Sequence, residues 1–168
     1  MTTPDIKDLY FEADTRKHQQ CVARIMVEVV KKMLDRAMAH DASKFESIER
    51  ESYTSPVWYL NTEEVPFGSE RYKELTAQMG KGWDHHKMKN DHHFEFFEPY
   101  SVQTLNDSFK SMDVFALIEM MCDWIAAATR RGNEPILALD YIKKKHPIDE
   151  QLECIIRNSV EMLKRWRV

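Results

Sequence analysis

Glycine and proline are scarce in this sequence, with four and six residues among 168. Strands need frequent turns, and turns depend on these two residue types, so their scarcity argues against an all-β fold. No segment alternates polar and apolar residues convincingly with the period of two that a half-buried strand requires. The sequence therefore predicts an all-α protein.

Cysteine pairs and a strong charge imbalance are also lacking. Cys21, Cys122 and Cys154 lie far apart in apolar stretches, without the paired spacing of a thiolate zinc site. We expect them to be buried thiols in a reducing compartment. The formal net charge is −4 and the basic residues are dispersed apart from the C-terminal end, so nucleic acid is not expected to be the main partner.

Long hydrophobic runs are absent as well. No stretch of about 18 apolar residues occurs, so no membrane span is expected. The N-terminal sequence MTTPDIKDLY has no charged-then-apolar signal pattern. These features predict a cytoplasmic protein, and the length, with no linker or repeat, predicts a single domain over 1–168.

The apolar pattern predicts about six helices in a bundle. The first is expected over 10–39, where one inward-facing stripe begins at His18 and continues through Val22, Ile25, Val29 and Met33. Further helices are expected over 42–52, 69–86, 112–131, 135–145 and 149–166, with Ser69 and Ser111 as N-caps and Gly132 as a stop. The aromatic-rich segment 54–68 is predicted to be a lid or binding loop, and 98–108 a second loop.

One carboxylate stands out in the segment FALIEMMCDWIAAAT, residues 115–129. This predicted helix is apolar nearly all round, so Asp123 is expected to be buried. An ionised carboxylate in such a place is costly unless it is paired or bound to a metal. The alternative is an ion pair with an arginine or histidine, or a partly exposed position beside Glu119.

A histidine and an aspartate, His40 and Asp41, lie where the first predicted helix ends and the second begins. Adjacent residues on a helix point about 100° apart, but at a junction both side chains can converge on one ion. The alternative is ordinary capping, in which the histidine interacts with the helix dipole and the aspartate caps the next helix.

Four of the seven histidines lie in the block GWDHHKMKNDHHFEFF, residues 82–97. His86 and His93 are seven residues apart, as are His85 and His92, so each pair shares a face if the block is helical. One pair would then face a metal and substrate, and the other water or carboxylates. Imidazoles and carboxylates from several helices form a mixed ligand set that suits divalent transition metals.

The order His18, His40-Asp41, Asp123 on successive predicted helices resembles the H…HD…D pattern of the HD superfamily of metal-dependent phosphohydrolases, over roughly residues 14–130. The sequence is still more similar to the uncharacterised DUF5662 family of bacteria and phages. Three segments carry that likeness, namely HDASKFESIERESY, HHKMKNDHH and EMMCDW.

The resemblance implies an HD-like helical bundle with a divalent transition metal (Mn, Co, Ni, Fe or Zn), as one or two ions. By position His18, His40, Asp41 and Asp123 match the ligand pattern, and we expect His86 to join them. In HD sites with two metals the extra histidines usually come from elements farther apart in sequence, so the short spacing here favours one ion.

Other polar residues are candidates for catalysis and substrate binding. We expect His93 or His85 to move protons and Lys44 to neutralise a substrate phosphate. Asn90 and Arg130 are expected to contact the substrate. Alternatively, Lys44 is a solvated helix lysine and Arg130 interacts with the dipole of its own helix.

The function that this resemblance implies is hydrolysis of a nucleotide or a similar small phosphate ester. Two alternatives stay open: an HD-fold di-iron oxygenase, and a catalytically inactive nucleotide-binding protein. The expected partner is a small phosphorylated molecule, and the apolar C-terminal helix could pair subunits in a homodimer.

Overall fold

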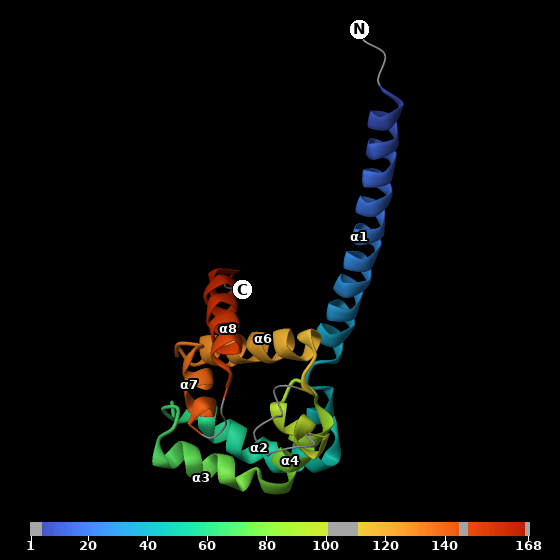
Figure 1. Cartoon of the computed structure of the whole chain (residues 1–168). Coiled ribbons are helices and arrows are strands. Elements are labelled where there is room, and N and C mark those ends of the chain that lie inside the picture. The colour runs from blue at the N-terminus through green and yellow to red at the C-terminus, as the bar shows by residue number, and fades with distance from the viewer. Residues whose placement is uncertain (1–4, 101–110, 145–147, 167–168) are drawn as a thin grey trace. The chain divides into compact units, whose positions relative to one another are not determined.

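The structure is a computed structural model that describes residues 5–100, 111–144 and 148–166 (Figure 1). The all-α prediction is confirmed, because these residues form helices and no strand. The α-helices are α1 Ile6–Ala39, α2 Ser47–Thr62, α3 Glu70–Gln78, α4 Gly80–Lys89, α6 Val114–Arg130, α7 Leu137–Lys143 and α8 Glu150–Leu163. Short 3₁₀ segments are η1 Ala42–Phe45, η2 Phe94–Tyr100 and η3 Lys164–Trp166.

The chain divides into two compact units, Met1–His40 and Asp41–Val168. The described part of the first unit is α1, which Asp5 caps by accepting a hydrogen bond from the Lys7 amide at 3.1 Å. None of the residues of α1 is buried, so the stripe predicted to face inward is not covered. A helix that forms a unit alone has no second element on which to bury a face.

The prediction of a loop over 54–68 is wrong for its first half, because α2 continues to Thr62. Pro56 lies inside this helix and is buried on the same face as Tyr53 and Leu60. The latter two pack with residues of α3 in one apolar cluster. Burial of this face outweighs the backbone hydrogen bond that a proline cannot donate. The expected lid is therefore largely a core helix.

The single helix predicted over 69–86 is two helices. Ser69 caps α3 as predicted, since its hydroxyl accepts a hydrogen bond from the Tyr72 amide at 3.1 Å. The break comes at Gly80, whose φ of 42° lies in the left-handed region that glycine adopts without a Cβ penalty. The next helix, α4, then runs on to Lys89 and carries the first histidine doublet.

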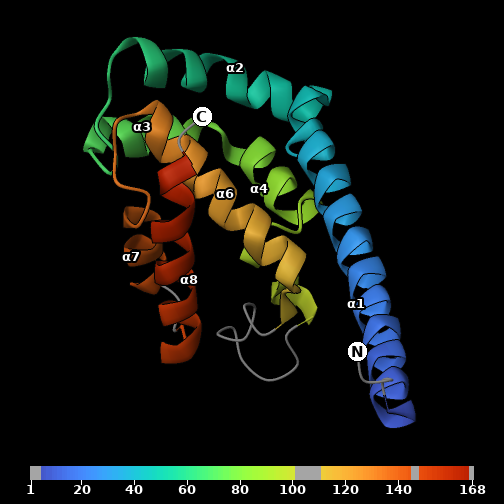
Figure 2. The same cartoon turned by 90° about the horizontal axis from the view of Figure 1, so that it is seen from above.

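A second core joins α6, α7 and α8. Met121, Leu139, Ile156 and Val160 form its buried cluster, where α6 and α8 lie side by side (Figure 2). Asp113, and not Ser111, caps α6. Its carboxylate accepts a hydrogen bond from the Ala116 amide at 2.8 Å.

The end of α6 and the start of α8 lie where the sequence predicts them. Gly132 follows α6 with a φ of 64°, as a helix stop requires. Asp149 caps α8 through a hydrogen bond from the Gln151 amide at 2.9 Å. Most of the loop predicted over 98–108 and the end of the helix predicted to reach Lys145 lie outside the described residues.

The cysteine prediction is wrong in one respect. Cys21, Cys122 and Cys154 are all free but exposed. Cys122 directly follows the buried Met121, and one residue along a helix turns the side chain by about 100°. Across the described residues, no helix is both long and apolar enough to cross a membrane.

Candidate metal centre

The centre begins at Asp41, the first residue of the second unit. Its backbone is left-handed, with a φ of 57°, a conformation that aspartate tolerates better than most residues. One carboxylate oxygen, Oδ1, lies 3.2 Å from Nε2 of His86 and 3.5 Å from Nε2 of His92. The other, Oδ2, pairs with the ammonium group of Lys44. The carboxylate thus links η1 to two histidines.

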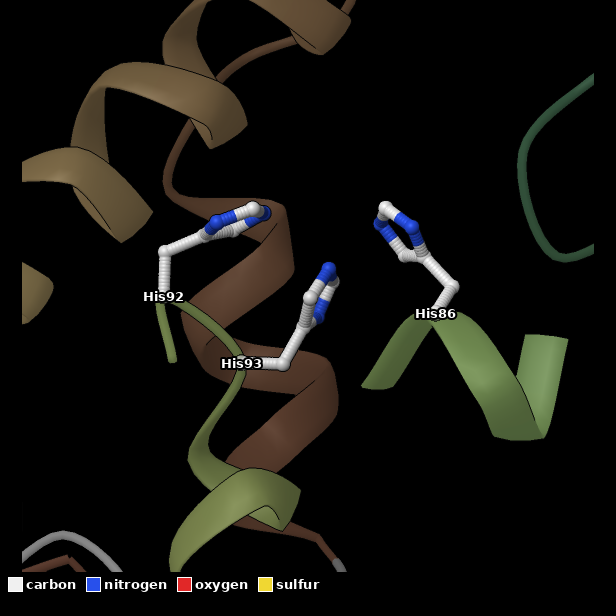
Figure 3. Close-up of side chains that lie close together, drawn as sticks. All are labelled: His86, His92 and His93. Carbon is white, nitrogen blue, oxygen red and sulfur yellow. The ribbon is translucent and has the colours of Figure 1, made fainter. Parts of the chain in front are cut away.

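Three histidines converge beside this carboxylate. His86 comes from α4, whereas His92 and His93 come from the turn that joins α4 to η2. One ring nitrogen from each lies within 4.8 Å of the other two, and Figure 3 shows the three rings facing one another. His86 and His92 are only 1% and 2% exposed, so two of the rings are shielded from bulk water.

A buried carboxylate lies behind His86. Glu49 of α2 is 0% exposed, and its Oε2 accepts a hydrogen bond from Nδ1 of His86 at 2.8 Å. Burial raises the pKa of Glu49, but hydrogen bonds from His85, Ser43 and His86 outweigh that and hold the pKa below its ordinary value. Since an ionised carboxylate only accepts, Nδ1 of His86 donates to Glu49, and Nε2 points toward Oδ1 of Asp41.

A second carboxylate lies behind His92 in the same way. Glu119 of α6 is 9% exposed, and its Oε1 is 3.1 Å from Nδ1 of His92. Nε2 of His92 therefore also faces Asp41. A carboxylate on the outer nitrogen of the ring is typical of metal-binding histidines, because the outer hydrogen bond fixes the tautomer and the ring orientation.

The third ring, His93, lies against both of the others. Its centroid is 4.8 Å from that of His86 and 4.4 Å from that of His92. Burial, together with the neighbouring His92 and His86, lowers the pKa of His93 to about 3. Its Nε2 is buried and has no hydrogen-bond partner within the described part of the chain. His93 is therefore neutral near pH 7, which is the state that ligates a cation.

The predicted site residues of the second unit gather in one place, with one exception. Asn90 donates hydrogen bonds to Ser43 Oγ and to the carbonyl of His86, both at 2.8 Å, and so fastens the end of α4 to η1. Asp123 is half-buried on α6 and close enough for its charge to raise the pKa of His93. Arg130 is exposed at the last turn of α6.

Two predicted ligands belong to the first unit. His18 lies on the exposed surface of α1, and His40 is the residue that follows its last turn. The structure describes the two units separately, so the expectation that these histidines ligate the metal stays a prediction.

The pairing of His86 with His93 and of His85 with His92 applies only if the histidine block is one continuous helix. Because α4 ends at Lys89, the turn brings both members of the second doublet to His86, and His85 contacts Glu49 instead. No pattern in the sequence indicated that Glu119 contacts His92.

The comparisons with known proteins identify one family. No protein of curated function and no solved structure matches the chain. The description "Family of unknown function (DUF5662)" applies to a match over residues 7–162, a range that includes every residue of the centre described above. This confirms the resemblance seen in the three motifs, and the chain belongs to the DUF5662 family.

Proposed function

We propose that the protein is a metal-dependent phosphohydrolase of the HD type, and that His86, His92, His93 and Asp41 hold its divalent transition metal. The observation that carries this proposal is the convergence of three imidazoles, with one carboxylate oxygen of Asp41 within 3.5 Å of two of them, His86 and His92. Three nitrogens and one oxygen suit zinc, iron, manganese, cobalt or nickel.

The packing of the rings supports a cation between them. Three imidazoles whose ring nitrogens lie within 4.8 Å of one another in a buried place form a crowded set of polar groups that bulk water cannot screen. A cation between the rings would be attracted to the lone pair of each deprotonated ring nitrogen. The two buried carboxylates, Glu49 and Glu119, add negative charge behind two of the rings, which raises their basicity as ligands.

A bound divalent cation would supply Lewis acidity, because it polarises a phosphoryl oxygen and makes water a better nucleophile near neutral pH. The chain itself supplies Lys44, whose side chain is 43% exposed and is paired with Asp41. An ammonium group at this position can hold the negative charge of a phosphate next to the centre. The HD resemblance supports a nucleotide or a similar small phosphate ester as the substrate.

The proposal is tested with protein purified without an affinity tag. Elemental analysis should find about one transition metal per chain, as one N₃O centre implies. Added Mn²⁺, Co²⁺ or Ni²⁺ should support phosphate release from at least one member of a panel of nucleoside mono-, di- and triphosphates. Absence of metal, together with no metal-dependent release across the panel, would contradict the proposal. About two irons per chain would instead support the di-iron oxygenase.

Replacement of Lys44 by methionine is expected to separate substrate binding from metal binding. The loss of one charged hydrogen bond, worth about 1.5–3 kcal/mol, should lower kcat/KM about 10- to 100-fold. The metal content should not change, because the ammonium group itself cannot ligate a cation. Lys89→Met is the matched control: Lys89 is 57% exposed and lies near Glu46 rather than Asp41, so its replacement should leave kcat/KM within about twofold.

A further inference from the structure

Glu49 contacts two adjacent histidines at once. Its Oε1 accepts a hydrogen bond from Nδ1 of His85 at 2.7 Å, and its Oε2 accepts one from Nδ1 of His86 at 2.8 Å. Neighbouring residues on a helix point about 100° apart, so a group that reaches both must lie between them. Glu49 is buried, and each of its two carboxylate oxygens accepts a hydrogen bond from a different histidine ring.

We propose that Glu49 is a positioning residue that fixes the tautomer and ring orientation of His86 and thereby sets the metal affinity of the centre. The part that concerns affinity rests on the proposed function. Glu49 does not face the convergence point itself, since both of its oxygens are on the outer side of the rings. It acts through His86, whose Nε2 lies 3.2 Å from Asp41.

Other neighbours of His86 hold the plane of its ring and contact its two nitrogens. Trp83 stacks on the ring at 6.0 Å between centroids, and Tyr53 meets it edge-on at 5.9 Å. The side-chain nitrogen of Asn90 donates to Ser43 and to the carbonyl of His86, and it also lies 3.1 Å from Nδ1 of His86, where Ser43 Oγ lies at 3.4 Å. Two carboxylates therefore compete for the ring proton of His86, Glu49 at Nδ1 over 2.8 Å and Asp41 at Nε2 over 3.2 Å, and the shorter contact with the fully buried Glu49 favours Nδ1.

Glutamine at position 49 discriminates between the two histidines. A carboxylate accepts from both rings, whereas an amide offers one accepting oxygen and one donating nitrogen. One histidine must then move its proton to Nε2. His85 is 28% exposed, so water can satisfy its altered ring, whereas His86 is 1% exposed. We expect His85 to change tautomer in Glu49→Gln and His86 to keep its own.

Metal affinity should fall in a graded way. In Glu49→Gln, His86 keeps its orientation but loses the charged acceptor. The zinc Kd should then rise about tenfold, the lower end of the loss in metal affinity that follows when the hydrogen-bond partner of a ligand is replaced. In Glu49→Ala both hydrogen bonds are lost, and the Kd should rise about 100-fold. Glu46→Gln is the matched control, because Glu46 lies 3.6 Å from Nε2 of His85 and has no contact with His86 among the described residues. Its Kd should stay within about twofold of the wild type.

The experiment combines zinc titration calorimetry on the full chain with long-range ¹⁵N–¹H NMR of the histidine rings in metal-free protein. The wild type should show protons on Nδ1 of both His85 and His86, and Glu49→Ala should lose the one on His86. A purely structural role would lower the thermal unfolding temperature of both variants while the tautomer of His86 and the zinc Kd stay as in the wild type, and that result would overturn the proposal.

The two proposals fail in different ways. If the wild type binds no zinc, manganese, cobalt or nickel, the proposed function fails, and the ring spectra of the metal-free chain still decide the role of Glu49. A His86 proton that stays on Nδ1 in Glu49→Ala counts against positioning. Should Glu49→Ala not fold, Glu49→Gln keeps the same size and shape, and a change of tautomer at His85 alone supports the inference.

Discussion

Replacement of His86 by alanine is expected to abolish metal binding at micromolar concentrations. Structural four-ligand zinc sites bind with about 10–16 kcal/mol, so one ligand of four contributes roughly 2.5–4 kcal/mol, or about 100- to 1,000-fold in Kd. His86 is also the ring on which the centre converges, since it lies near Asp41, His92 and His93 together. Calorimetric titration with zinc measures the loss directly.

The stacked indole of Trp83 gives a second measurement. It lies 6.0 Å from the ring of His86 and 5.5 Å from that of His93, between centroids, so paramagnetic Co²⁺ in the centre should quench its fluorescence. The chain has four tryptophans, so the quenching is measured in the wild type and in Trp83→Phe, and the difference between the two is the contribution of Trp83 beside the centre. Quenching should disappear in His86→Ala, whereas it should persist in His85→Ala, the matched control from the adjacent position.

The same variants should separate in thermal stability. A ligand at 100 times its Kd stabilises the folded state by about 2.7 kcal/mol, so excess zinc should raise the unfolding temperature of the wild type, and a chelator should reverse the shift. His86→Ala should show no zinc-dependent shift. If His85→Ala loses zinc as completely as His86→Ala, the centre is wrongly assigned, because His85 bonds to Glu49 on the outer side of the rings.

The fold class was predictable from composition, but the boundaries of the helices around the centre were not. Pro56 and the aromatic residues near it suggest a loop, and only the burial of the Tyr53 and Leu60 face on α3 explains why α2 continues to Thr62. In the same way, Gly80 ends one helix and begins another. Tertiary packing decides both cases, and periodicity within one segment carries no information about it.

The candidate site was predictable in its residue types and less so in its grouping. Asp41, Lys44 and three members of the histidine block, namely His86, His92 and His93, lie at the centre. The partners of the histidines come from far along the chain: Glu49 precedes His86 by 37 residues and Glu119 comes from another helix. A spacing rule that assumes one helix cannot find such partners, because it relates only residues on one continuous element.

The approach of α4 to α2 suggests the second large effect, at Gly82. A Cβ atom added at this buried glycine would lie 2.4 Å from Cβ and 2.7 Å from Oγ of Ser52, and 3.2 Å from the carbonyl oxygen of Ile48. In a helix with free space, Gly→Ala stabilises by about 0.5–1 kcal/mol. Here the overlap outweighs that gain, and Gly82→Ala should destabilise the protein by about 1–3 kcal/mol in urea unfolding.

The clash should also weaken the metal centre, because α2 carries Glu49 and α4 carries His86. Separation of these two helices lengthens the 2.8 Å hydrogen bond between them, so the zinc Kd of Gly82→Ala should rise as its stability falls. The test of the cause is the double variant with Ser52→Gly, which removes the two closest atoms. Stability and Kd should both recover in the double variant, with a coupling above about 1 kcal/mol. If the two substitutions are simply additive, the helices do not meet at Gly82, and the position of His86 relative to Glu49 depends on other contacts.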